Sequence, residues 1–368
     1  MDAITDEFKY GIIAYASNNI GDEVQSIAQM RFLPRVDYYI ARDKIKQFKP
    51  DTPDEKVKLI MNAWWMQQMH NFPPPDTVIP LPISMHIRRE ICQKQFLEKN
   101  NVYKWFIKNS PIGCRDTATE ERLASAGIPA YFSGCLTITL VGDKSLKNKG
   151  EKYILCVNLT EEELSVVHKR TIVPVRSFNK AFQGGSMEKR LCLAKSILYL
   201  IHNASCVITR NLHVALPCLA FNTPVLQFKV APNPSGNYER FFGNDVLCNC
   251  LKPSEFIKDP DSYDINNPPQ NPTTFHEMRD KLIYACSQFT GFDNNTPIFN
   301  SDFDPLWNLV NLLQMDKQQM YRNLYYVTDD YLYDAYINRK NKLMDKYYLI
   351  GDISKHMEVI TDNQTSNK

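Results

Sequence analysis

A short polar turn between a predicted strand and a predicted helix carries three side chains that suit anion chemistry. Residues 206–209 (CVIT) form a buried apolar run typical of a strand, and the small-residue run 213–220 indicates a helix. Arg210, Asn211 and His213 lie between them or at the start of the helix. In an open α/β sheet, ligands bind just past the carboxyl ends of the strands, where the N–H groups of a helix N-terminus favour an anion. The turn therefore predicts a phosphate or carboxylate site.

Polar or aromatic side chains also follow two strands that are predicted earlier in the chain. Asn62 and Trp64 come after the apolar run 57–61, and His86 follows the run 78–85. Because the carboxyl ends of parallel strands meet at one edge of a sheet, we expect these residues at the same edge. Two alternatives stay open: Trp64 is a core residue, and His86 belongs to a surface loop.

The first predicted strand, 10–17 (YGIIAYAS), is followed by a polar turn that contains Asn19 and Asp22. A helical pattern then runs through Gln29, and we expect Asn19 or Asp22 to cap this helix. The G-x-G-x-x-G spacing of a dinucleotide-binding turn is absent. These residues therefore either belong to a ligand site or serve only to form the turn.

Arg115 precedes a helix that is predicted over 117–126. Asp116 or Thr117 would cap this helix, and Gly127 would end it.

Two further cations, Lys229 and Arg240, belong to a loop rich in Pro, Gly and Asn that follows the predicted strand 224–228. Such a loop is not a core element. It is either part of the ligand site or a solvated surface loop.

Strands and helices alternate along the chain, which predicts a mostly parallel sheet in each α/β domain. The length of 368 residues favours two such domains. We expect α/β domains over 1–148 and 149–300, joined at the polar segment 144–152. A helical tail over 301–356 is expected to pack back on the body, and 357–368 to be a frayed terminus.

Composition excludes several classes of protein. The 43% apolar and 23% charged residues indicate folded domains. A net charge of +2 leaves no electrostatic footprint for nucleic acid. No signal peptide and no apolar run of membrane-spanning length is visible. The ten cysteines are scattered, and Cys248-x-Cys250 has no second pair to complete a zinc site. We therefore expect a cytoplasmic, metal-free protein with buried thiols.

Four segments stand in an order and spacing that resembles a known family. They are 19–22 (NIGD), 62–64 (NAW), 113–116 (GCRD) and the block 207–225. Together they resemble the polysaccharide pyruvyl transferases, whose signature is a strand, Arg-Leu-His, a small-residue helix and Gly-x-Pro-Val. The resemblance extends from about residue 10 to about residue 245.

This resemblance implies a fold and a reaction. The fold would be similar to that of B-type glycosyltransferases, with two Rossmann-like domains that face a cleft. The family transfers the pyruvyl group of phosphoenolpyruvate (PEP) to a sugar, usually as a cyclic ketal across two hydroxyls. The domain 1–148 would bind the acceptor and the domain 149–300 the donor. No cofactor is implied, because PEP is the donor substrate.

The family pattern also assigns roles to residues of this chain. Arg115 and the turn with Arg210 and His213 would hold the phosphate and carboxylate of PEP, which guanidinium groups and a helix N-terminus suit. His213 and His86 are the candidates for acid–base catalysis, since an imidazole gains or releases a proton near neutral pH. The expected substrate-binding residues are Arg115, Arg210, Asn211, Leu212, Lys229, Arg240, Asn19, Asp22, Asn62 and Trp64.

One departure from the family pattern concerns the donor. The family has Arg-Leu-His without interruption, whereas residues 210–213 are Arg-Asn-Leu-His. An Asn cannot replace a bidentate cation. There are three alternatives. The Arg210 side chain extends to the donor from its neighbouring position, or Arg176, Lys229 or Arg240 supplies the positive charge, or the donor is not PEP.

Two other functions stay open. A nucleotide-sugar glycosyltransferase of similar architecture would need a clamp for base and ribose, for which Glu239 or Asp245 could serve. A non-catalytic carbohydrate-binding relative would agree with Asn211 in the Arg position.

For a pyruvyl transferase, the acceptor would be a sugar of a cell-surface polysaccharide or of its lipid-linked precursor. The latter implies peripheral contact with the inner face of the membrane.

Overall fold

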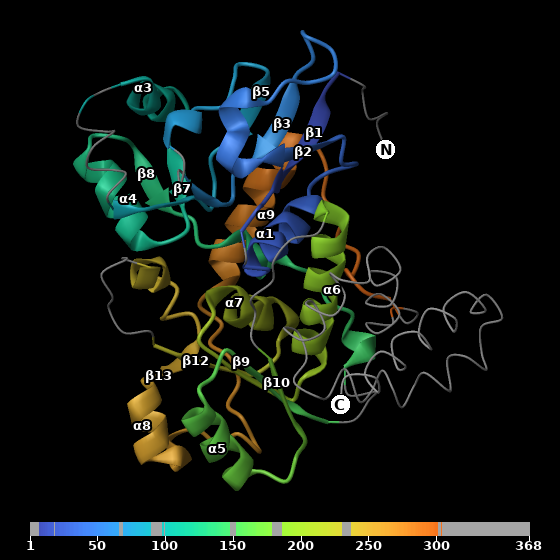
Figure 1. The fold of residues 1–368 in the computed structure, drawn as a ribbon, viewed down its shortest axis with the longest axis vertical. Coiled ribbons are helices and arrows are strands. Elements are labelled where there is room, and N and C mark those ends of the chain that lie inside the picture. Colours follow the sequence, from blue (N-terminus) through green and yellow to red (C-terminus); the bar gives the residue numbers. More distant parts are fainter. Residues whose placement is uncertain are drawn as a thin grey trace, which may run out of the picture.

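A computed structural model gives the fold of the chain. It describes residues 7–17, 19–65, 69–89, 98, 100–147, 152–178, 186–229, 237–300 and 303. These residues form two α/β lobes, each built on a parallel sheet (Figure 1). The prediction of two Rossmann-like units is thereby confirmed. The helical tail expected over 301–356 lies outside the described residues apart from Phe303, and so does 357–368.

The N-terminal sheet has four parallel strands in the order β2-β1-β3-β5. Their bounds are Lys9–Ala14 (β1), Tyr38–Ala41 (β2), Val57–Ile60 (β3) and Val78–Leu81 (β5). The inner strands β1 and β3 are mostly buried, which explains why apolar residues predominate in them. Gly11 lets β1 and β2 pack closely, because a Cβ at this position would lie 2.6 Å from Ile40 Cδ1.

Four short strands continue the N-terminal lobe and carry the first site residues. They are Trp64–Trp65 (β4), His86–Ile87 (β6), Ile112–Cys114 (β7) and Ala130–Phe132 (β8). β4 pairs with β6 and β7 with β8, and a bridge between Met85 and Cys114 links the two pairs. Trp64 therefore lies opposite His86. Arg115 follows directly after β7, so the predicted common edge brings these residues together.

The helices of this lobe begin and end at identifiable residues. They are Gly21–Met30 (α1), Asn101–Lys108 (α3) and Thr117–Ser125 (α4). Asp116 caps α4 through its side chain, and Gly127 follows its end with φ +76°, as predicted. The predicted cap of α1 is wrong. Ile20 precedes the helix, Asn19 Oδ1 accepts only the N–H of Gly21 (3.2 Å), and Asp22 lies inside the first turn.

The C-terminal sheet has five parallel strands in the order β10-β9-β11-β12-β13. They are Ile154–Val157 (β9), Val175–Phe178 (β10), Cys206–Thr209 (β11), Val225–Phe228 (β12) and Asn249–Leu251 (β13). The helices are Glu161–Arg170 (α5), Met187–Asn203 (α6), Leu212–Phe221 (α7) and Pro253–Lys258 (α8). The strand and helix predicted around the polar turn are confirmed. The sequence analysis missed α5, although Thr160 and Glu163 form a capping box at its start.

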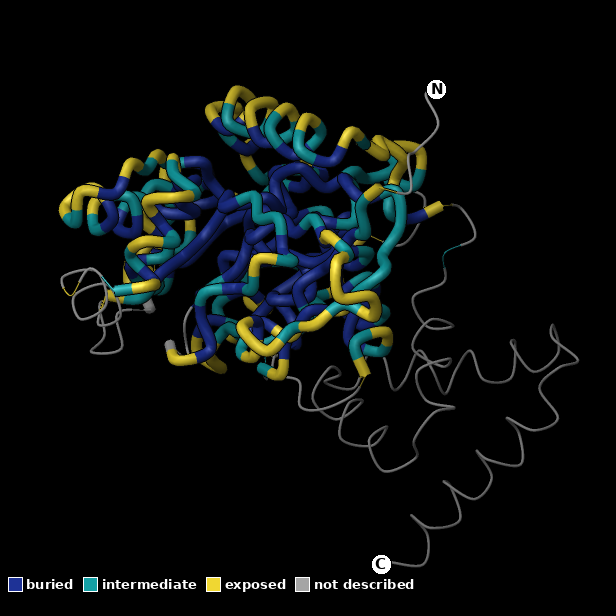
Figure 2. The backbone as a smooth tube through the Cα atoms, turned by 90° about the horizontal axis from the view of Figure 1, so that it is seen from above, coloured by how far each residue is buried: buried dark blue, intermediate teal, exposed yellow. Residues whose placement is uncertain are grey.

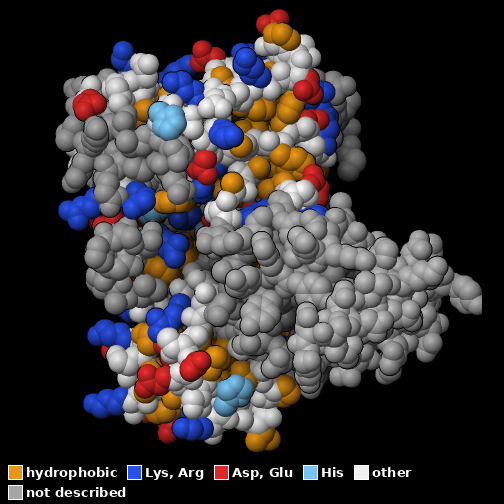
Figure 3. Space-filling view, viewed as in Figure 1, with side chains coloured by type: hydrophobic (Ala, Val, Ile, Leu, Met, Phe, Trp, Pro, Cys, Tyr) orange, Lys and Arg blue, Asp and Glu red, His pale blue; other side chains and the backbone are white. Residues whose placement is uncertain are grey.

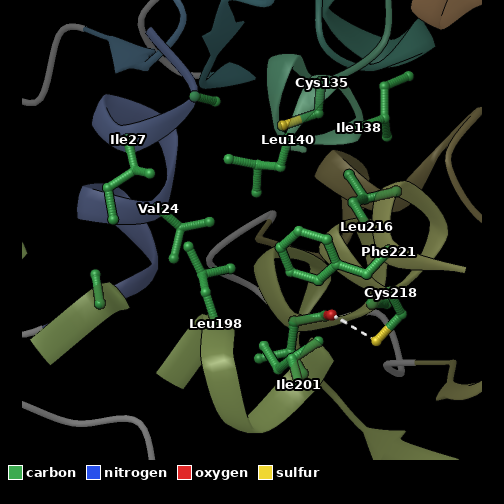
Figure 4. Close-up of a cluster of buried hydrophobic side chains, with 14 of the residues drawn as sticks. Val24, Ile27, Cys135, Ile138, Leu140, Leu198, Ile201, Leu216, Cys218 and Phe221 are labelled. Atoms are coloured by element: carbon green, nitrogen blue, oxygen red, sulfur yellow. Dashed lines mark hydrogen bonds between the residues drawn. The ribbon is translucent and has the colours of Figure 1, made fainter. Parts of the chain in front are cut away.

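The helices α1, α6 and α7 pack between the two sheets (Figures 1 and 4). Figure 4 shows buried side chains that meet there, among them Val24, Ile27, Leu198, Ile201, Leu216 and Phe221. One ion pair also crosses this interface, with Arg190 Nε of α6 2.5 Å from Glu23 Oε1 of α1, and both side chains are buried. Figure 2 shows the buried residues running through the centre of the described body. The two lobes thus share one continuous core.

Helix α9 (His276–Thr290) follows the C-terminal sheet in the chain but contacts the N-terminal lobe. Lys58 Nζ of β3 donates a hydrogen bond to the carbonyl of Phe289 (2.8 Å). Just past the helix, Asp293 forms an ion pair with Arg31 (2.7 Å). In Figure 1, α9 runs beside α1 towards β1 and β3. The end of the described chain therefore helps to hold the two lobes together.

Candidate functional site

The polar turn after β11 is held by its own side chains. Thr209 Oγ1 accepts the N–H of Asn211 (3.0 Å), and Asn211 Nδ2 donates to Asn158 Oδ1 (2.7 Å) after β9. Asn211 precedes α7 without a side-chain capping bond, and Leu212 is buried. The Asn211 amide and the Leu212 side chain therefore stabilise the turn and have a structural role. It presents His213, whose ψ of 19° departs from regular helix, towards the other lobe.

Arg210 forms an ion pair with Glu163 in the first turn of α5. Its Nε and Nη2 donate to the two carboxylate oxygens. Glu163 is buried, and its Oε2 also accepts the N–H of Thr160 (2.8 Å). The charge of Arg210 is thus matched by a carboxylate of its own lobe. Its contacts give no support to the donor-binding role that the sequence analysis expected.

Arg115 reaches from the end of β7 to the other lobe. Its Nη1 donates to Gln25 Oε1 (2.9 Å) and lies 3.4 Å from His213 Nε2. Arg115 is 2% exposed, and its Nε is buried without a hydrogen-bond partner among the described residues. No carboxylate in the described part of the chain forms a salt bridge with it. A buried guanidinium is costly unless a counter-charge is supplied, so this arrangement favours an anionic ligand.

Arg240 is a second cation of this kind. It lies in the 3-10 helix η5 (Asn237–Phe241), and its Nε is buried without a partner among the residues that the structure describes. The same part of the chain offers it no salt bridge. Burial and the positive charge of Arg115 lower the pKa of Arg240 to about 10, against the opposing charges of Asp22 and Asp116. Two guanidiniums that repel each other therefore lie close together in the ligand-free protein.

Asn244 fastens the backbones of the two arginines to each other. It is fully buried, and its Nδ2 donates to the carbonyls of Arg115 (2.9 Å) and Arg240 (3.2 Å). The N–H of Thr117 also donates to the carbonyl of Phe242 (3.2 Å). These bonds hold η5 of the C-terminal lobe against the start of α4. The sequence analysis missed Asn244, because an Asn in a turn gives no signal of a contact so distant in the chain.

His86 and Asp116 form a buried hydrogen-bonded pair, with His86 Nδ1 2.6 Å from Asp116 Oδ2. Burial lowers the pKa of His86 below its usual 6.5; Asp116 opposes this, and the charges of Arg115 and Arg240 add to it. Burial favours the neutral form of Asp116, but the charge and hydrogen bond of His86, with help from Arg115 and Thr119, hold the pKa of this carboxyl below 3.8. A neutral imidazole therefore donates its Nδ1 proton to a carboxylate, which leaves Nε2 as the basic nitrogen. The surface-loop alternative for His86 is wrong.

The predicted ligand residues near α1 are held by contacts within the N-terminal lobe. Asp22 Oδ2 accepts a hydrogen bond from the hydroxyl of Ser17 (2.6 Å). Asp22 Oδ1 accepts hydrogen bonds from Asn19 Nδ2 (3.4 Å) and Gln25 Nε2 (3.5 Å). Asn62 Nδ2 donates to the carbonyl of Gln25 (3.0 Å), and Asn62 Oδ1 is buried without a partner in the described chain. Since Gln25 also binds Arg115, this network supports the guanidinium from the side of the N-terminal lobe.

Trp64 and Lys229 have no hydrogen bond, ion pair or cation–π contact with Arg115 or Arg240 in the part of the chain that the structure describes. Trp64 is half-buried, and the guanidinium carbons of Arg42 and Arg88 lie 5.2 and 5.6 Å from its ring centroid. The core residue of this dipeptide is Trp65, which is 1% exposed. Lys229 is exposed at the end of β12, and no contact described for it leads to Arg115.

The site joins cations from both lobes with two imidazoles. Figure 3 shows Lys and Arg side chains along the junction of the two lobes. No group of three His, Cys, Asp or Glu side chains that could hold a metal ion occurs within the described ranges. Among the described helices, none has the length and apolar character needed to span a bilayer. The chemistry that this arrangement can perform is anion binding at Arg115 and Arg240 and proton transfer at His86 and His213.

Comparison with solved structures gives distant similarities. Among solved structures, an uncharacterised protein from Klebsiella pneumoniae is 16% identical, with a TM-score of 0.43 over 67% of this chain and 93% of that chain. An E. coli heptosyltransferase solved with ADP is 12% identical, with a TM-score of 0.23 over 69% and 98%. The glycotransferase of kitacinnamycin is 8% identical, with a TM-score of 0.26 over 77% and 95%. No curated protein matches.

The family comparison covers most of the elements described above. A family model described as polysaccharide pyruvyl transferase matches residues 19–228, which is more than half of the chain. The match includes His86, Arg115 and the turn at 210–213. The chain belongs to the polysaccharide pyruvyl transferase family.

Proposed function

We propose that this protein transfers the pyruvyl group of PEP to two hydroxyls of a saccharide, forming a cyclic ketal and releasing phosphate. The family supports pyruvyl transfer. The observation that carries the choice of donor is the pair Arg115 and Arg240, two adjacent guanidiniums without a carboxylate counter-ion among the described residues. PEP has a phosphate and a carboxylate, and a guanidinium can bind either group with two parallel hydrogen bonds.

His213 lies against Arg115 and therefore beside the proposed donor. An imidazole gains or releases a proton near neutral pH, so His213 is the proposed acid. The protonated imidazole then delivers its proton to C3 of PEP, and C2 becomes electrophilic. An acceptor hydroxyl adds to C2 through oxygen and gives up its proton. Phosphate leaves with the electrons of its C2–O bond, and a second hydroxyl adds to C2 and loses its proton to close the ketal.

We propose further that the acceptor is a sugar of a cell-surface polysaccharide or its lipid-linked precursor, and that transfer takes place on the cytoplasmic side of the membrane. The family description supports a saccharide acceptor. A nucleotide-sugar glycosyltransferase has weaker support, because Glu239, the candidate ribose clamp, forms an ion pair with Arg122 of α4. Its carboxylate is already matched in the ligand-free protein.

Phosphate release tests the proposed function directly. The purified protein is mixed with PEP and a panel of galactosides, mannosides and lipid-linked sugars. We expect release with at least one acceptor, and loss of release in a folded His213→Ala variant. PEP should also raise the unfolding temperature, whereas nucleotide sugars should not. Stabilisation by nucleotide sugars alone would favour glycosyl transfer, and a folded protein that neither releases phosphate nor binds PEP would be a non-catalytic relative.

A further inference from the structure

We propose that His86 is the base that removes the proton from the acceptor hydroxyl, and that Asp116 is the residue that positions it. The inference rests on the proposed function and adds a second imidazole to it, with a role different from that of His213. It starts from the hydrogen-bonded pair between β6 and the first residue before α4, in which Nδ1 and Oδ2 are 2.6 Å apart.

The Asp116 carboxylate is fixed from two sides. Its Oδ1 accepts hydrogen bonds from the backbone N–H (2.9 Å) and the hydroxyl (2.8 Å) of Thr119, as befits the cap of a helix. Its Oδ2 is left for His86. The imidazole ring is therefore held in one orientation with its proton on Nδ1, and Nε2 makes no hydrogen bond to any residue that the structure describes. Such a nitrogen is available to a substrate hydroxyl.

The charges that face His86 set when it acts as a base. They are the carboxylate of Asp116 and the guanidiniums of Arg115 and Arg240. In the ligand-free protein the two arginines disfavour an imidazolium, so His86 is neutral and a weak base. A bound donor would offset the positive charge of both arginines and thus raise the basicity of His86. The acceptor hydroxyl is consequently activated only when PEP is in place.

The proton balance of the transfer then closes with two histidines. His213 gives a proton to C3 of PEP, while the hydroxyl oxygen bonds to C2 and its proton passes to His86 Nε2. The phosphate leaves with the electrons of the C2–O bond, and the second hydroxyl bonds to C2 and gives its proton to solvent. The His86 imidazolium then returns its proton to solvent, and His213 takes up a proton from solvent for the next turnover. Both histidines lie beside Arg115, one in each lobe, so that acid and base reach the donor from opposite domains.

The Asp116→Asn substitution tests most directly whether His86 is the base and Asp116 positions it. Asparagine caps a helix as well as aspartate does, so the start of α4 should remain intact in the variant. Its amide N–H, however, would donate to His86 Nδ1 and move the ring proton to Nε2, where the base is needed. A comparable change of tautomer costs about 10⁴-fold in a serine protease. We expect kcat for acceptor-dependent phosphate release to fall roughly 10²- to 10⁴-fold, while stabilisation by PEP is retained.

Three further readouts separate catalysis from folding. The wild-type rate should decline at acidic pH as His86 becomes protonated, and added imidazole should partly restore activity to His86→Ala. In ¹⁵N NMR spectra at neutral pH, the ring proton of His86 should lie on Nδ1 in the wild type and on Nε2 in Asp116→Asn. The exposed His168 on α5 provides the control, since His168→Ala should change none of these values.

The outcomes distinguish the inference from the function on which it rests. Wild-type rates in both Asp116→Asn and His86→Ala would overturn the role of His86 and leave pyruvyl transfer standing. A folded wild type that releases no phosphate from PEP with any acceptor would remove the proposed function, and the role of His86 with it. A wild type with its ring proton on Nε2 would contradict the positioning by Asp116 whatever the rates.

Discussion

Replacing Arg240 by methionine should stabilise the ligand-free protein and weaken donor binding at the same time. The folded protein lowers the pKa of Arg240 from 12.5 to about 10, so the charged form is disfavoured relative to the unfolded chain. At about 1.4 kcal/mol per pKa unit, holding the charge costs roughly 3 kcal/mol. The residue as a whole is partly exposed although its Nε is buried, so we reduce this cost to about half for solvent screening. We therefore expect Arg240→Met to raise the free energy of unfolding by about 1–2 kcal/mol.

The pH dependence of this stabilisation follows from the difference in the pKa of Arg240 between the folded and unfolded protein. A cation whose pKa is lowered by folding carries its full penalty below the folded pKa, here about 10. The penalty fades between that pH and 12.5, where the folded protein loses the proton that the unfolded chain retains. The stabilisation by Arg240→Met should therefore be complete at neutral pH. The same variant loses a charge-assisted contact to the donor worth about 1.5–3 kcal/mol, or roughly 10- to 100-fold in the Kd of PEP.

Urea unfolding with and without PEP measures both effects, and isothermal titration gives the Kd. Arg279→Met is the matched control. Arg240 lies over the ring of Phe241 and Arg279 on α9 over the ring of Phe275, but Arg279 pairs with the carboxylate of Asp280. The control should leave PEP binding unchanged and should not stabilise the protein. An Arg240→Met variant that is less stable than the wild type without ligand, or that PEP stabilises as strongly as the wild type, would contradict an uncompensated charge that binds the donor.

Two further substitutions examine how the site is assembled. Asn244→Ala removes both bonds that join the backbones of the arginines, and should cost about 1–3 kcal/mol in urea unfolding and raise the KM for PEP; an unchanged KM would contradict a positioning role. Arg210→Ala leaves the buried carboxylate of Glu163 without its partner, so it should lower the free energy of unfolding by about 1–3 kcal/mol with little effect on the KM for PEP. A tenfold rise in that KM would show that Arg210 binds the donor after all.

The elements that position the site were predictable because their signals are local. Strands of a parallel sheet are buried on both faces, so β9 and β11 are apolar runs that any reading of the sequence detects. The polar turn between β11 and α7 was located correctly for the same reason. The helix α5 was missed because only Leu164, Val166 and Val167 interrupt its polar residues, and its capping box was the one signal of its start.

The candidate site was predictable in its residue types but not in its pairings. Arg115 and His213 stand 98 positions apart in the chain and meet only because the start of α7 faces the end of β7. Arg210, next to His213 in sequence, was the natural choice for the donor cation. Folding instead pairs it with Glu163 and brings Arg240, from a loop that had two interpretations, beside Arg115.

The sequence by itself determined that this chain is a two-domain α/β protein of the pyruvyl transferase family, because apolar periodicity and motif order are properties of contiguous segments. Only the tertiary structure decided which arginines lack a counter-ion and which nitrogen of His86 is basic. The physical reason is that the state of a charged group depends on whatever folding brings within a few ångströms of it. The positions of Glu163, Asn244 and Asp116 in the sequence do not predict which arginine or histidine each of them contacts.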